Sequence, residues 1–236
     1  MVLITIIGMS LFTIPFCIIA LHSLGSYLKD RQNRQKKHVF YAFLCISIGF
    51  ISGMAGAAIT STDMSPDNLM AVNILFRSFD AFNTIGAFWF FVFLTDFIEK
   101  TKKYLPYVVI HLGVTLMLIL LTPAGVIMLA GEEPIIDRAG VRSLALLFFW
   151  FLYWGIIAYQ FLNYSKSMTK KVAIRRSRMM SAGAAFVILA YVFTIIAGIS
   201  QDITFKFLSH TCAGLSGIVF YVGFVAPQWL KRMWEK

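Results

Sequence analysis

The sequence predicts an all-α membrane protein, a polytopic bundle of seven transmembrane helices, and three observations lead to this fold class. First, 59% of the 236 residues are hydrophobic and only 14% are charged, whereas soluble domains carry about 25% charged residues. Second, apolar segments of the roughly 20 residues that a helix needs to cross a bilayer recur seven times along the chain. Third, basic residues alternate between the two sides of these segments.

Each apolar segment is interpreted as a helix, because a helix satisfies its backbone polar groups within its own segment, as lipid requires. The first segment has no basic residue before it and no cleavage site, so we expect a retained helix and no signal peptide. The connecting segments are short, and we expect one membrane domain over residues 1–236. The predicted spans are approximately 3–28, 38–61, 68–95, 104–130, 142–165, 178–200 and 205–226.

The loop charges predict the orientation. The first, third and fifth loops and the C-terminal tail hold 17 of the 21 Lys and Arg residues, and the opposite side holds Arg138, Arg142 and Lys206. Because basic loops stay in the cytoplasm, we expect the N-terminus outside and the C-terminus inside, in a prokaryotic plasma membrane. The net charge of +10 is then explained by an anionic inner leaflet and not by nucleic acid. Contacts with this lipid or with a cytoplasmic protein partner are expected at Lys170, Lys171, Arg175, Arg176 and Arg178.

The third segment is unusual because its centre is polar. At 1.5 Å per residue, Asp80 lies about 2 Å and Arg77 about 7 Å from its midpoint. Asn73, Arg77, Asp80 and Thr84 share one helical face. A charge at this depth costs at least about 2.5 kcal/mol unless it is paired, and Arg77 and Asp80 are spaced to pair with each other. The face predicts either structural contacts with the second or seventh helix, or a site for a ligand, an ion or a proton.

Small residues four positions apart predict close helix packing, because they let two backbones approach in lipid. The second segment carries Gly49, Gly53 and Ala57 at this spacing, and the seventh carries Ala213 and Gly217. The contact lies either within one chain or between two chains of a homodimer.

No cofactor, metal site or catalytic group is expected, and the chain is therefore not predicted to be an enzyme. The three cysteines lie within apolar segments without metal-binding spacing. One alternative is a b-type haem held between His22 and His111, which lie at similar depth. The consecutive aromatic residues at 148–154 surround the whole fifth helix and define no cofactor site.

Two segments carry a family resemblance. The third helix ends in residues 97–100 (Phe-Ile-Glu-Lys), and the chain leaves the membrane through residues 226–232 (Ala-Pro-Gln-Trp-Leu-Lys-Arg). With seven helices and short loops, these segments resemble the seven-helix membrane sensor region that precedes many prokaryotic histidine kinases. In that family a similar exit leads into a cytoplasmic signalling domain. This chain ends at Lys236, so the resemblance implies that a separate partner transmits the signal.

We therefore expect a membrane sensor or receptor-like protein that signals through a separate cytoplasmic or membrane partner. A small or lipid-soluble ligand would enter among the second, third and seventh helices and contact the polar face of the third. Two alternatives use the same residues: a transporter of small solutes or ions, and an accessory structural subunit of a membrane complex.

Overall fold

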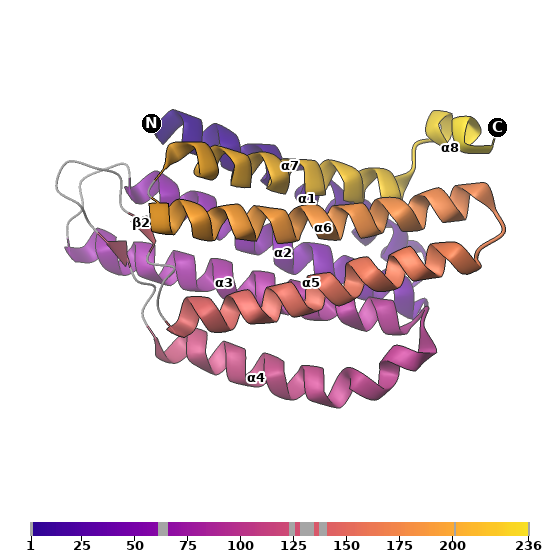
Figure 1. Cartoon of the computed structure of the whole chain (residues 1–236), viewed down its shortest axis with the longest axis horizontal. Coiled ribbons are helices and arrows are strands. Elements are labelled where there is room, and N and C mark those ends of the chain that lie inside the picture. Colours follow the sequence, from indigo (N-terminus) through magenta and orange to yellow (C-terminus); the bar gives the residue numbers. More distant parts are fainter. Residues whose placement is uncertain are drawn as a thin grey trace.

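The computed structural model describes residues 2–60, 66–122, 126–127, 135–136, 141–200 and 202–235. This part of the chain is helical except for two short strands, and seven of its helices are long and apolar enough to cross a membrane (Figure 1). The predicted all-helical fold with seven candidate spans is thereby confirmed. The elements are α1 (Val2–Lys29), α2 (Arg34–Thr60), α3 (Pro66–Thr95), η1 (Glu99–Tyr104), α4 (Leu105–Leu121), β1 (Val126–Ile127), β2 (Ile135–Ile136), α5 (Val141–Ser167), α6 (Lys171–Ser200), α7 (Ile203–Val225) and α8 (Gln228–Glu235).

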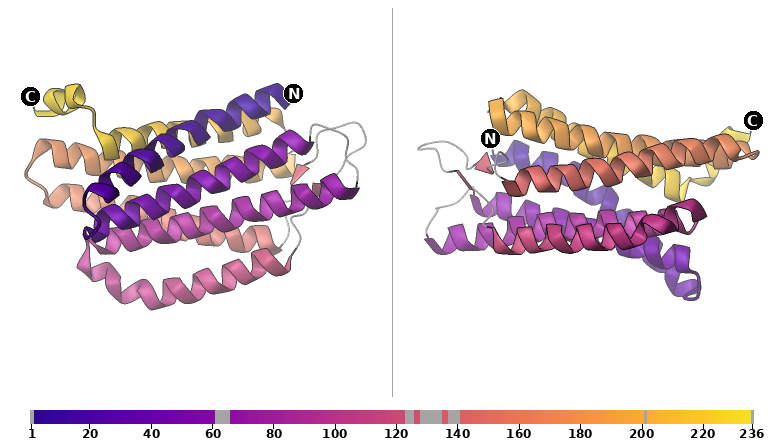
Figure 2. Two further views of the ribbon diagram at one scale, coloured as in Figure 1. Left: turned by 180° about the vertical axis from the view of Figure 1, so that it is seen from behind. Right: turned by 60° about the horizontal axis from the view of Figure 1, so that its bottom comes forward.

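The long helices lie side by side along one axis, and most of them pack against their neighbours in sequence. α7 also packs against α1, while α3 contacts both α4 and α5, so α4 is left at the edge of the bundle (Figure 2). The turn before α2, η1, the turn before α6 and α8 all lie at one end of the bundle. We call this the basic end, because the Lys and Arg residues of the first, third and fifth loops are there.

α4 is shorter than the sequence predicted, since it ends at Leu121 and the predicted span ran to residue 130. Thr122 leaves the helix with φ −106° and ψ 137°. This is the conformation that a following proline imposes, and residue 123 is a proline. Further on, Val126 pairs with Ile136 in a short antiparallel ladder. The remaining residues of the predicted span, 123–125 and 128–130, lie outside the described residues.

α8 was not predicted, because eight mixed polar and apolar residues do not form a span. The chain leaves α7 through Ala226, whose φ of 41° is left-handed and ends the helix. Leu230 and Trp234 of α8 are buried in a small cluster with Ala226. Packing against the bundle therefore stabilises a helix that is too short to be stable by itself.

The small residues of α2 and α7 are in contact with neighbouring helices of the same chain. A Cβ atom added at Gly53 would lie 2.7 Å from the ring of Phe79 on α3, and one at Gly217 would lie 2.9 Å from Pro15 on α1. At Gly49 the added atom would lie 2.9 Å from the amide nitrogen of Asn83. Close approach of α2 to α3 and of α7 to α1 therefore requires glycine at these positions. Ala57 and Ala213 are partly buried on the same two helices.

The core contains a cluster of phenylalanine rings from several helices, which we call the aromatic core: Phe16, Phe43, Phe90, Phe220 and Phe224. The ring centroids of Phe43 and Phe224 are 4.9 Å apart, and those of Phe90 and Phe220 are 5.4 Å apart. Phe90 lies six residues beyond Thr84 on α3, or about 9 Å closer to the basic end. The aromatic core therefore lies between the polar centre of α3 and the basic end.

Candidate functional site at the centre of the bundle

The polar face of α3 contacts α5 through Thr84. Asp80 is only 3% exposed, and Thr84 is fully buried. The Thr84 hydroxyl donates to the backbone carbonyl of Asp80 at 2.7 Å and accepts a hydrogen bond from the Trp150 indole at 3.2 Å. We expected this face to meet the second or the seventh helix. Thr84 meets α5 through Trp150, while α3 as a whole packs most extensively against α2.

Two tryptophans of α5 line this region from the other side. The Trp150 ring stacks on Tyr191 of α6, with centroids 4.1 Å apart. Trp154 follows one turn later, so both side chains lie on the same face of α5. It is 3% exposed, and its ring lies 5.3 Å from that of Phe90 in the aromatic core. We call Thr84, Trp150, Trp154 and Tyr191 the central site.

The indole nitrogen of Trp154 is buried and has no hydrogen-bond partner among the residues that the structure describes. Leaving a buried donor unpaired costs about 1–3 kcal/mol, and more than 90% of buried polar groups have a partner. The Trp150 indole on the same face is satisfied by Thr84. The central site therefore presents one unused donor in surroundings that are otherwise aromatic.

The sequence did not identify these tryptophans as site residues, because the aromatic run at 148–154 surrounds the whole helix. The structure separates its members: Phe148 is exposed, whereas Trp150 and Trp154 are buried against α3. The sequence did contain one indication. Trp150 and Trp154 are four residues apart, as are Asp80 and Thr84 on α3, so each pair lies on one face of its helix.

Arg77 lies two turns from Thr84 and contacts α4. Its guanidinium donates to the carbonyl oxygen of Leu120 at 3.3 Å. Leu120 is in the last turn of α4, where carbonyl groups have no partner within the helix, and a positive charge there also interacts favourably with the helix dipole. Arg77 thus caps α4. Its Nε atom is buried and without a partner in the described part of the chain.

The ion pair that we expected between Arg77 and Asp80 is not formed, because the guanidinium is directed to α4. Asn73 is partly buried one turn before Arg77 on the same helix. Of the four residues predicted to form one ligand or ion pathway, Thr84 belongs to the central site, Asp80 is buried one turn before it on α3, and Arg77 is engaged in an interhelical cap. Ion pairs between described residues join Asp30 to Lys36, His38 to Asp96, and Glu99 to Lys102.

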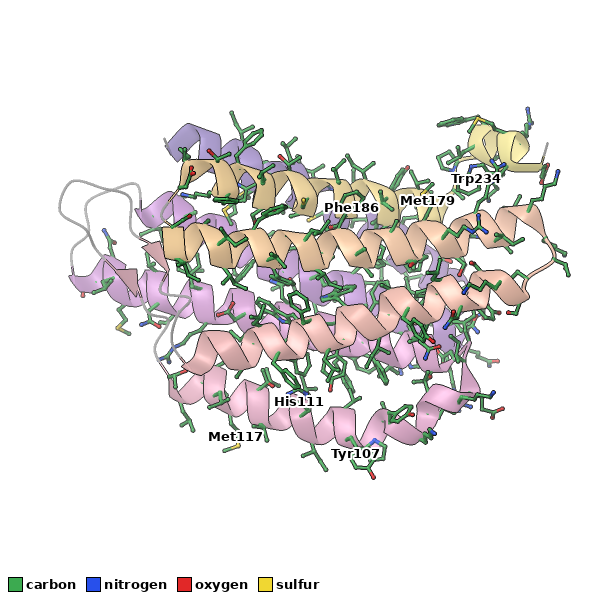
Figure 3. The ribbon with its side chains drawn as sticks, in the orientation of Figure 1. Tyr107, His111, Met117, Met179, Phe186 and Trp234 are labelled. Atoms are coloured by element: carbon green, nitrogen blue, oxygen red, sulfur yellow. The ribbon has the colours of Figure 1, made fainter. Side chains whose placement is uncertain are left out.

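The two histidines considered for haem binding are not brought together. His22 is exposed on α1, and α1 and α4 lie at different edges of the bundle. His111 of α4 is directed toward α5 (Figure 3), where its Nδ1 atom lies 3.1 Å from the Tyr153 hydroxyl. A haem bound between His22 and His111 is therefore not compatible with this arrangement.

The basic residues around the start of α6 divide into two groups. Lys170, Lys171, Arg175 and Arg178 are exposed. Arg176 is not: its Nε donates to the carbonyl of Gly223 and a terminal nitrogen donates to that of Phe224. The first group lies at the surface, whereas Arg176 stabilises the end of α7.

No protein-family model matches the chain, and no curated protein matches it. Its function is therefore inferred from its own residues. The central site offers a hydroxyl whose hydrogen bonds are used within the site and one indole donor without a partner among the described residues.

Proposed function

We propose that this protein is a seven-helix membrane sensor that binds a small, lipid-soluble molecule at the central site. The observation that carries the proposal is the Trp154 indole, a buried donor without a partner among the described residues, at the centre of the bundle. A ligand oxygen, such as that of a carbonyl group, would accept this hydrogen bond. The aromatic surroundings fit an apolar ligand body, and the Trp154 indole supplies the polar group that orients it.

In this proposal the N-terminus is outside and the basic end faces the cytoplasm. The distribution of Lys and Arg supports this orientation, because basic loops are retained on the cytoplasmic side. The same asymmetry fits a prokaryotic plasma membrane with an anionic inner leaflet.

The aromatic core favours a sensor over a transporter. A solute or ion moving from the central site to the basic end would have to separate rings that are in contact, among them Phe43 and Phe224 with centroids 4.9 Å apart. A signal needs only a shift of these rings. Trp154 contacts Phe90, Phe90 contacts Phe224, and the Phe224 carbonyl is held by Arg176. These successive contacts lead from Trp154 to Arg176. They end near the exposed basic residues of α6, which a separate cytoplasmic partner would contact.

The first test is to identify what copurifies with the protein. Wild-type protein, Trp154→Phe and the control Trp229→Phe are purified in native lipid discs, and solvent extracts are compared by mass spectrometry. We expect one small molecule in near-equal amounts in the wild type and the control. Its occupancy in Trp154→Phe falls about fivefold, which corresponds to one neutral hydrogen bond of about 1 kcal/mol.

Two results would contradict the proposal. One is an extract that is the same for all three proteins after correction for protein amount. The other is uptake of protons or small solutes into liposomes that contain the protein, above that of empty liposomes, which would support transport.

A further inference from the structure

α8 lies at the basic end, beside the ends of α6 and α7 (Figure 1). It starts directly after the left-handed turn at Ala226, and the Pro227 carbonyl accepts the amides of Leu230 and Lys231 at its beginning. The chain therefore changes direction after α7 and places α8 at the point where the candidate spans end.

The helix has one apolar arc. At 100° per residue, Trp229, Leu230, Met233 and Trp234 lie together, and Gln228, Lys231, Arg232 and Glu235 lie on the other side. Leu230 and Trp234 are buried against the bundle, and Figure 3 shows Trp234 directed toward the part of α6 that carries Met179. The other half of the arc stays exposed: Trp229 by 67% and Met233 by 52%.

The buried half of the arc determines the direction of the exposed half. Because Leu230 and Trp234 hold the helix against Val172, Met179 and Val222, Trp229 and Met233 are kept facing outward. Arg232 is exposed next to them, and Lys231 is on the same turn. An exposed tryptophan beside basic side chains is typical of helices that lie in the interface of a bilayer.

Charge decides between lipid and protein as the occupant of this face. Lys170, Lys171, Arg175 and Arg178 are exposed at the same end, which matches the negative potential of an anionic leaflet. The exposed apolar part of α8 consists of two side chains, whereas a stable protein interface buries about 800 Å² on each partner. A membrane surface needs no such area, because the bundle itself is anchored.

We infer that α8 is an interfacial helix that inserts Trp229 and Met233 into the bilayer surface and binds anionic lipid headgroups through Lys231 and Arg232. This surface is separate from the central site, and the inference does not depend on a ligand binding there.

The experiment measures the depth of two positions on α8. In a background with Cys17, Cys45 and Cys212 replaced by alanine, Met233→Cys and the control Gln228→Cys are labelled with an environment-sensitive fluorophore. The proteins are reconstituted into phosphatidylcholine vesicles with and without phosphatidylglycerol. We expect the probe at 233 to shift to the blue and to resist quenching by iodide, more so with phosphatidylglycerol, while the probe at 228 is quenched in both.

A second variant tests the headgroup contacts. Lys231→Gln with Arg232→Gln leaves the buried residues of α8 unchanged, so thermal unfolding should match that of the parent. The additional protection that phosphatidylglycerol gives to position 233 should be lost. The inference is overturned if positions 228 and 233 are quenched equally in anionic vesicles. It is also overturned if protection at 233 rises with the protein-to-lipid ratio, because a second copy would then cover the face.

Discussion

The guanidinium of Arg176 on α6 donates from Nε to the carbonyl oxygen of Gly223 on α7 at 2.8 Å. One of its terminal nitrogens also donates to the next carbonyl, that of Phe224, at 2.7 Å. α7 ends at Val225, so both carbonyls belong to the last turn, whose oxygens have no partner within the helix. The positive charge also lies at the negative end of the helix dipole. One side chain thus completes the terminus of a neighbouring helix.

Replacement of Arg176 by glutamine should therefore destabilise the protein. We expect a loss of about 2–3 kcal/mol in the free energy of unfolding, because two charge-assisted hydrogen bonds are removed from partly buried carbonyls. The matched control is Arg175→Gln at the exposed neighbouring position, with a change within about 0.5 kcal/mol. Equilibrium unfolding in one mixed-micelle system measures both variants. If Arg176→Gln and Arg175→Gln lowered the free energy of unfolding equally, the hydrogen bonds from Arg176 to α7 would not contribute to stability.

Gly86 should be the least replaceable glycine at the contact of α2 with α3. A Cβ atom added there would lie 2.5 Å from Cγ1 of Ile46 and 3.0 Å from the backbone carbonyl of Ala42. Because the backbone cannot move aside easily, Gly86→Ala should cost about 1–3 kcal/mol. At Gly155 no atom lies within 4 Å of an added Cβ. Gly155→Ala should be neutral or stabilise by up to about 1 kcal/mol through helix propensity, and thermal unfolding of the two variants should move in different directions.

The two tryptophans of the central site should respond differently to replacement by phenylalanine. Trp150→Phe leaves the Thr84 hydroxyl without its donor and should lower stability by about 1 kcal/mol beyond the packing loss. Trp154→Phe removes a donor that has no partner in the part of the chain that the structure describes, so in ligand-free protein its hydrogen-bond cost should be absent. Denaturant unfolding after delipidation measures both. If delipidated Trp154→Phe lost more unfolding free energy than delipidated Trp150→Phe, the Trp154 indole would have a hydrogen-bond partner in the protein and the prediction would be wrong.

The start of α7 should weaken in acid. Asp202 accepts a hydrogen bond from the Thr204 amide at 2.8 Å, which lowers the pKa of this carboxyl below its ordinary 3.8. A lowered pKa means that the stabilisation is complete above pH 3.8 and is lost as the pH falls through the pKa of the folded state. Asp202→Asn keeps the capping oxygen and does not titrate. The wild type and the variant should have the same melting temperature at neutral pH. Only in acid should the melting temperature of the wild type be lower than that of the variant.

Several features of the fold were predictable because they depend on local sequence. The seven apolar segments, the polar centre of α3 and the small residues of α2 and α7 can all be recognised within about 30 residues. The early end of α4 was also encoded locally, in the proline that follows Thr122, but hydropathy extended the segment past it. α8 was missed because its stability comes from Leu230 and Trp234 packing on α6 and α7, and not from its own eight residues.

The sequence by itself determined the number of candidate membrane spans and the asymmetric distribution of basic residues. The physical reason is that lipid forces each span to satisfy its backbone internally, so every span can be recognised without its neighbours. Only the tertiary structure decided that Thr84 meets Trp150, that Arg77 caps α4 and that Arg176 caps α7 from 48 residues away. These contacts depend on which helix faces lie together, a relation between distant segments that no local pattern contains. The unpaired indole of Trp154, on which the proposed function depends, is of the same kind.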